Sequence, residues 1–139
     1  SNLCWTAAGD DADVATVLDF GLCAPTFALY DLATAIERNA IAWLQLERGM
    51  EAIHPATARE VITGYAEVLP LSQAQRDLLA DLLPLVHIDF ALSEIDCYQG
   101  AFGARTQADQ AWGSFLLGHA AWFETAPGLA LLASIRDPD

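Results

Sequence analysis

After Pro25 the apolar residues of this chain recur at spacings of three and four, the period of an α-helix with one buried face. The clearest stretch predicts a helix over about 28–46, whose apolar face carries Leu29, Leu32, Ala33, Ile36, Ala40, Trp43 and Leu44. The same spacing predicts a helix over 55–68, with Pro55 in its first turn, and one over 73–83, with Ser72 as its N-cap. Further helices are predicted from there to about residue 102, over 106–124 and after Pro127. Pro84 is expected to end or kink the helix over 73–83, because proline lacks a backbone N–H.

The first 22 residues lack this helical spacing and are predicted to form a β-hairpin. Strands are expected over 3–6 and 14–20, joined by a turn at 9–13 that is rich in glycine and aspartate. The predicted fold class is therefore α+β and mostly α, a short hairpin followed by a helical bundle. We expect a single partial domain over 1–139, with the hairpin over 1–22 and a helical subdomain over 26–139.

The charge balance of the chain excludes several classes of protein. Six arginines and no lysine stand against 19 acidic residues, which gives a net charge of −13. A nucleic-acid binder needs a basic surface, and a P-loop ATPase needs a lysine for its phosphates. No apolar run is long enough to span a membrane, and the three cysteines form neither a metal-ligand cluster nor a disulfide framework. We therefore expect a cytoplasmic protein with buried, reduced thiols and no nucleic-acid or membrane partner.

The second predicted strand ends in Asp19-Phe20-Gly21, a carboxylate beside a flexible glycine turn. A carboxylate in this position can hold Mg²⁺ against the phosphates of a nucleotide. Folding of the hairpin brings Asn2 toward the same end, so that an amide oxygen and a carboxylate become a pair of oxygen ligands. The alternative is an ordinary turn at the end of a strand. Asp31, which begins the first apolar helix, is a third candidate, and its alternative role is to cap that helix or favour its dipole.

These motifs, Asn2-Leu3, 17–21 and 30–33 followed by a long helix, resemble the C-terminal lobe of the aminoglycoside phosphotransferase and choline kinase-like family, which includes homoserine and hydroxylysine kinases. The resemblance implies the C-terminal lobe of a protein-kinase-like fold, with Asn2 and Asp19 as the ligands of Mg²⁺. It implies that Asp31 ties the catalytic loop to the helical lobe. It also implies that the catalytic aspartate, in a loop of the form H-G-D-x-x-x-x-N, and the ATP-binding N-terminal lobe lie upstream of Ser1.

The activity that this resemblance implies is phosphoryl transfer from ATP or GTP to a hydroxyl group of a small, amine-bearing acceptor. The acceptor would be of the aminoglycoside, homoserine or hydroxylysine type. The partners would be the nucleotide, the acceptor and the N-terminal lobe of the same protein. The 139 residues alone are then expected to be an inactive part of a kinase. The second hypothesis is a non-catalytic, acidic helical module that binds a partner.

Polar residues on two of the predicted helices are candidates for the acceptor pocket, because an acidic helix along a cleft can receive a cationic substrate. The candidates are Glu37, Asn39, His87, Glu94 and Tyr98. The alternative is a set of solvated acidic faces with one hydrogen-bonded histidine in the core. His119 lies among aromatic residues at helical spacing, which indicates core packing rather than a ligand site.

Overall fold

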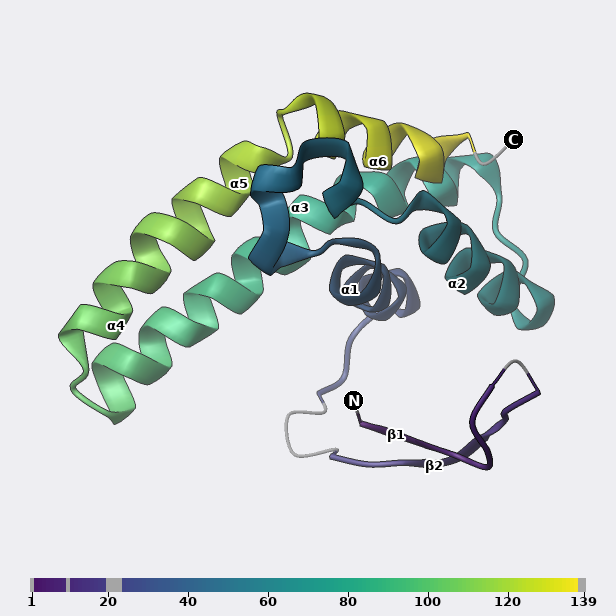
Figure 1. Cartoon of the computed structure of the whole chain (residues 1–139), viewed down its shortest axis with the longest axis horizontal. Coiled ribbons are helices and arrows are strands. Elements are labelled where there is room, and N and C mark those ends of the chain that lie inside the picture. Colours follow the sequence, from purple (N-terminus) through teal and green to yellow (C-terminus); the bar gives the residue numbers. More distant parts are fainter. Residues whose placement is uncertain (1, 10, 20–23, 138–139) are drawn as a thin grey trace.

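Helix α3 (Gln73–Asp96) runs through the middle of the helical part and contacts most of the other helices (Figure 1). The structure is a computed structural model, and it describes residues 2–9, 11–19 and 24–137. At the start of α3 the Ser72 hydroxyl accepts a hydrogen bond from the Gln75 N–H, and the Gln75 side chain accepts one from the Ser72 N–H. This reciprocal cap satisfies donors that the first helical turn leaves free, so the start of α3 is fixed by its own sequence.

After α3 the chain folds back along it in a second helical path. Gly103, with a φ of +62°, lies at the turn, in a backbone conformation that favours glycine. In order, the segments are the π-helical η2 (Cys97–Ala101), α4 (Arg105–Gln110), the π-helical η3 (Ala111–Gly118) and α5 (His119–Trp122). Figure 1 shows the returning path, in green, beside the second half of α3, and α6 (Ala126–Arg136), in yellow, along the first half.

Helix α1 (Ala28–Ala40) packs against both α3 and α2 (Pro55–Val68). The segment between α1 and α2 is η1 (Trp43–Ala52), 3-10 turns interrupted at Gly49, which has a φ of +61°. The core draws its fully buried large apolar side chains from α1, α2, α3 and α6: Ile36, Ile62, Leu79, Leu83, Leu131 and Ile135. Burying each of them is worth about 1.5–3 kcal/mol relative to leaving it in water, so this core holds the helices together.

The β-hairpin lies apart from that core. Strands β1 (Leu3–Trp5) and β2 (Val14–Val17) pair antiparallel, with Leu3 opposite Val17 and Trp5 opposite Val14. Every strand residue is exposed, including Trp5 at 54% and Val17 at 49%. In Figure 1 the hairpin, in purple, lies to one side of the helices on the side of α1.

The predicted architecture, mostly helical with one antiparallel hairpin at the start, is confirmed. The helix expected over 28–46 is wrong beyond Ala40, because Ile41 leaves the helix and forms an isolated β-bridge with Ile53. Leu44, which was expected on the buried face, is 93% exposed. The bridge joins residues twelve apart, so the local apolar spacing carries no sign of it.

Pro84 was expected to end or kink the helix over 73–83, and the end is wrong, since α3 continues through Pro84 to Asp96. A proline inside a helix loses one hydrogen bond and costs about 3 kcal/mol. Leu83 and Val86 on either side of it are buried in the core, and burial of such side chains offsets that cost.

Two smaller expectations also differ from the structure. The second strand ends at Val17 rather than at residue 20. Cys4 and Cys97 are exposed, so the prediction of buried thiols is wrong for both, and Cys23 lies outside the described residues. Among the helices described, none has both the length and the apolar character that crossing a membrane requires.

Two helical glycines differ in what surrounds them, and this gives a test of the packing. A Cβ at Gly128 in α6 would lie 2.5 Å from the Trp122 carbonyl oxygen and 2.6 Å from the Phe123 Cα, whereas one at Gly64 in α2 would meet nothing within 4 Å. We expect Gly128→Ala to lower the free energy of unfolding by about 1–3 kcal/mol, because backbone must move. Gly64→Ala should raise it by about 0.5–1 kcal/mol, because alanine loses less entropy in a helix. Urea unfolding measures both, and a Gly128→Ala chain as stable as the parent would contradict the contact between α6 and the end of α5.

Candidate functional site

A cavity lies between the end of the hairpin and the outer faces of α1 and α2. We call it the hairpin hollow, and its volume is about 790 Å³. The lining residues are Asn2, Val17, Leu18, Asp19, Asp31, Leu32, Thr34, Ala35, Arg38, Val61 and Tyr65. Three of them, Asn2, Asp19 and Asp31, are residues that the sequence motifs singled out.

The backbone of the hairpin brings Asn2 and Asp19 to the same end. The Leu18 N–H donates a hydrogen bond of 2.8 Å to the Asn2 carbonyl oxygen, which continues the ladder beyond the pairing of Leu3 with Val17. Asp19 follows with a φ of +59°, a left-handed conformation that is uncommon for a residue with a side chain. Both residues line the hairpin hollow. Phe20 and Gly21, the rest of the motif, lie outside the described residues.

The donor set at this end of the hairpin suits a hard cation. An amide oxygen and a carboxylate are oxygen ligands, and Mg²⁺ usually takes one or two protein oxygens and completes its shell with water and phosphate oxygens. Within the described residues no cluster of three or more His, Cys, Asp or Glu side chains could hold a metal ion. A metal bound here would therefore depend on Asn2 and Asp19 together with oxygens from a ligand and from water.

Asp31 lines the hairpin hollow from the first turn of α1. The N-cap of α1 is Phe27, and no side chain caps the helix, so the capping role considered for Asp31 is wrong. Its position in the first turn still favours the helix dipole. Asp31 is exposed.

A second cavity, which we call the α1–α3 cleft, lies on the neighbouring face of α1 and has a volume of about 360 Å³. Its lining residues are Tyr30, Thr34, Glu37, Arg38, Val86, Asp89, Phe90 and Ser93. Thr34 and Arg38 also line the hairpin hollow, so the two cavities share part of one wall.

Tyr30 and Asp89 join α1 to α3 across the α1–α3 cleft. The Tyr30 hydroxyl donates a hydrogen bond to the Asp89 carboxylate. Burial, this hydrogen bond and the negative charge of Asp89 raise the pKa of Tyr30 to about 12. The phenol therefore remains protonated at neutral pH and continues to hold the carboxylate at the edge of the cleft.

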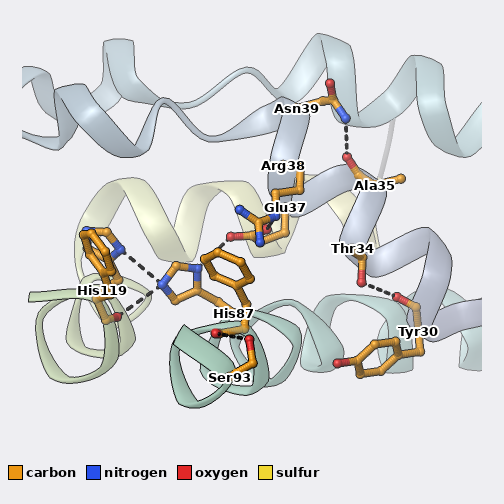
Figure 2. Close-up of polar contacts among 11 residues, drawn as sticks. Tyr30, Thr34, Ala35, Glu37, Arg38, Asn39, His87, Ser93 and His119 are labelled. Atoms are coloured by element: carbon orange, nitrogen blue, oxygen red, sulfur yellow. Dashed lines mark hydrogen bonds and ion pairs between the residues drawn. The ribbon is translucent and has the colours of Figure 1, made fainter. Parts of the chain in front are cut away.

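Behind the α1–α3 cleft a row of polar side chains runs from α1 through α3 to the returning path (Figure 2). His87 Nδ1 lies 2.6 Å from Glu37 Oε1, and His87 Nε2 lies 3.1 Å from His119 Nδ1 and 3.2 Å from the Phe115 carbonyl oxygen. Glu37 is 1% exposed and His87 is 3% exposed. Such buried polar groups persist only when they are hydrogen-bonded, and both residues are.

The two ring nitrogens of His87 face different partners. Nδ1 faces the Glu37 carboxylate, which accepts hydrogen bonds, and Nε2 faces both the Phe115 carbonyl oxygen and His119 Nδ1. Burial, together with the positive charge of His87, lowers the pKa of His119 to about 4, although Glu37 opposes the shift.

Trp43 covers this row of side chains. Its ring stacks on His87 with centroids 4.1 Å apart and on His119 with centroids 4.5 Å apart. Trp122 and Phe123 contact Trp43 edge-on. The aromatic rings cover one side of both histidines. His87 is buried and His119 is half-buried, so the prediction that His119 packs in the core holds only in part.

Of the candidates for acceptor binding, only Glu37 lines one of the two cavities, and His87, Asn39, Glu94 and Tyr98 do not. Glu37 lines the α1–α3 cleft and is bonded to His87, which lies behind it. Asn39 donates to the Ala35 carbonyl oxygen and is exposed. Glu94 and Tyr98 are half-buried and, like Asn39, are not among the residues that line the hairpin hollow or the α1–α3 cleft.

Sequence reasoning missed Arg38 and Tyr30 as residues of the site. Each lies on a helix whose apolar face was recognised, but on a different side of that helix. A signal for Arg38 was available, since it and Glu37 are adjacent opposite charges in an otherwise apolar and acidic helix. Nothing local indicated that His119 would meet His87, which is 32 residues away.

Comparison of this chain with protein-family models, with curated proteins and with solved structures found no match. The family resemblance drawn from the motifs therefore stays a hypothesis that depends on the residues themselves.

The lowered pKa of His119 predicts how the stability of the fold depends on pH. In the unfolded chain the pKa is about 6.5, and in the folded chain it is about 4. Between these values the unfolded chain binds a proton that the folded chain does not. The contribution of His119 is therefore complete above about pH 6.5 and is lost as the pH falls toward 4.

We expect His119→Gln, which cannot titrate, to flatten the fall in the free energy of unfolding between pH 6.5 and 4. Urea unfolding at several pH values gives this slope. The 19 carboxylates of the chain also titrate near this range, so the informative quantity is the difference between the variant and the parent. His54→Gln, at an exposed histidine, is the matched control and should keep the parental slope. Equal slopes for the parent and His119→Gln would contradict the lowered pKa of the half-buried His119.

Proposed function

We propose that this chain forms the metal-binding and acceptor-binding part of an ATP- or GTP-dependent phosphotransferase that acts on a hydroxyl group of a small, amine-bearing molecule. The observation that carries the proposal is that Asn2, Asp19 and Asp31 all line the hairpin hollow. These residues come from two segments, and they are the ones that match the motifs of the kinase family. We also propose that the chain has the fold of the C-terminal lobe of a protein-kinase-like enzyme.

In this proposal Asn2 and Asp19 hold Mg²⁺ at the end of the hairpin. The ion, when bound, neutralises charge on the phosphate oxygens of the nucleotide. The residues of the chain contribute position: the Leu18 N–H holds the Asn2 carbonyl oxygen beside the paired strands, and Asp19 follows with a left-handed backbone. Strained backbone of this kind is found more often at functional sites than elsewhere.

The α1–α3 cleft is the proposed place of the acceptor. The Asp89 carboxylate favours a cation there, and the overall charge of −13 attracts cations to the surface as a whole. A volume of about 360 Å³ is at the small end of the range for ligand pockets, which suits a single small molecule. Because the cleft and the hairpin hollow share Thr34 and Arg38, an acceptor in the cleft would lie beside a phosphate in the hollow.

The general base and the lobe that covers the nucleotide would come from outside these 139 residues. The exposed apolar side chains of the hairpin, among them Trp5 and Val14, support a partner surface at this end. The same exposure favours the second hypothesis, a non-catalytic acidic module that binds a partner through its hairpin. Metal binding at Asn2 and Asp19 distinguishes the two, because the module requires none.

Paramagnetic Mn²⁺, which replaces Mg²⁺ at oxygen sites, tests the metal site in the full 139-residue chain. We expect substoichiometric Mn²⁺ to broaden the NMR signals of the Asn2 side-chain amide and of the Leu18 and Asp19 backbone amides first. Asp19→Asn should remove this selectivity, because the variant lacks the charged ligand. Asp11→Asn, which removes one carboxylate from the exposed turn of the same hairpin, should leave it unchanged. Broadening spread evenly over the acidic surface, or unaffected by Asp19→Asn, would count against the site and in favour of the interaction module.

We also expect the purified 139-residue chain to show no turnover of ATP or GTP with any amine-bearing acceptor. The residues of a catalytic unit act together, and the proposal places the general base and the phosphate-binding lysine elsewhere. Coupled detection of ADP or GDP release measures this. Turnover that survives further purification and falls in Asp19→Asn would show that the chain has its own catalytic base.

A further inference from the structure

Arg38 lies in the last turn of α1, on the wall that the hairpin hollow and the α1–α3 cleft share. Its side chain is 42% exposed, so it reaches solvent at this point. Figure 2 shows it beside Glu37, on the opposite side of that residue from the His87 ring. Among the described residues that line the two cavities, it is the one that is basic.

Two contacts hold the guanidinium group of Arg38. Its Nε lies 3.2 Å from Glu37 Oε2 in an ion pair, and its Cζ lies 3.7 Å from the centre of the Phe90 ring. An arginine stacked on an aromatic ring and tied at one nitrogen has already lost much of its rotamer freedom. Its two terminal nitrogens make no hydrogen bond with any residue that the structure describes.

Other arginines of the chain are used differently. Arg48 directs Nε and a terminal nitrogen to Glu51, and Arg136 directs a terminal nitrogen to Asp81. These are exposed surface pairs, which contribute little to stability. The pair of Glu37 and Arg38 joins neighbours in one helix, so it connects no two elements of the fold. Its effect is to aim a guanidinium group.

The local charge leaves Arg38 available for an anion. The Glu37 carboxylate has one oxygen on Arg38 and the other on His87, so it does not saturate the guanidinium group of Arg38. The carboxylates of Asp19, Asp31 and Asp89 line other parts of the two cavities, so the site as a whole presents both signs.

We propose that Arg38 binds an oxyanion of a small ligand, a carboxylate or a phosphoryl group, at the wall shared by the hairpin hollow and the α1–α3 cleft, and that Glu37 is its positioning residue. A guanidinium group with two free nitrogens matches two oxygens of such a group. The inference goes beyond the proposed function, which assigns only cation recognition to the cleft. It does not depend on that function, because anion binding is measured without metal or nucleotide.

The test observes the arginine side chains of the 139-residue chain directly. With six arginines and no lysine, the ¹⁵N–¹H spectrum of the arginine Nε groups contains at most six signals to assign. Sodium acetate and inorganic phosphate are titrated separately at constant ionic strength. We expect a saturable shift at Arg38 that is absent at Arg48. If only acetate causes the shift, the ligand group is a carboxylate, and if only phosphate causes it, the ligand group is a phosphoryl group. If both anions cause it, the site accepts either group.

Variants separate a built site from a nonspecific one. Arg38→Gln should weaken anion binding by about tenfold, which corresponds to the loss of a charged hydrogen bond of about 1.4 kcal/mol. Because this variant lacks the Arg38 Nε signal, its binding is measured from the shifts of the neighbouring backbone amides. Arg48→Gln is the matched control and should bind as the parent does. Glu37→Gln should weaken binding by about threefold and shift the Arg38 Nε signal in the free protein.

Three results would overturn the inference. They are the absence of a saturable shift with either anion, equal shifts at Arg38 and Arg48, and parental affinity in Arg38→Gln. If Glu37→Gln does not fold, Arg38→Lys replaces it as the second variant. Lysine keeps the charge but not the planar fork, so binding should fall between those of the parent and Arg38→Gln, and full parental affinity would show that the orientation of the guanidinium group has no role.

Discussion

The buried pair of Glu37 and His87 is the interaction on which the arrangement of the helices depends. It joins α1 to α3 at 2.6 Å, with side chains only 2% and 4% exposed. Removing one partner of such a pair leaves an uncompensated buried charge and typically costs about 3–5 kcal/mol. His87 also reaches Phe115 and His119 on the returning path, and Trp43 from η1 covers both histidines. This one pair and its neighbours thereby connect α1, α3, the returning path and η1.

The same pair affects the surface of the protein. One oxygen of Glu37 is held inside by His87, and the other is directed to Arg38 at the edge of the α1–α3 cleft. A polar network in the core thus sets the direction of a side chain that meets solvent. In a chain with a net charge of −13, most of the surface attracts cations, and Arg38 is a local exception whose charge is not fully used by its neighbour.

Local sequence patterns predicted the parts of the fold that depend on local interactions. The apolar spacing of α1 and α2, the cap at Ser72 and the hairpin were read correctly because each depends on residues within a few positions. The bridge between Ile41 and Ile53 and the passage of α3 through Pro84 were not, because tertiary contacts decide both. For the candidate site, the hairpin motif indicated that Asn2 and Asp19 share one end. The meeting of His87 with His119 could not be predicted, since it requires the returning path to lie beside α3.

Helix α1 explains why the hairpin hollow and the α1–α3 cleft are neighbours. The hollow is lined by the α1 residues at 31, 32, 34, 35 and 38, and the cleft by those at 30, 34, 37 and 38, while those at 33, 36 and 40 are buried. Residues three and four apart lie on one face of a helix, so these sets occupy adjacent faces of α1 and overlap at 34 and 38. Groups bound in the two cavities would therefore be held by one rigid element. Their separation would be set by the width of a helix face and would not require a hinge to close.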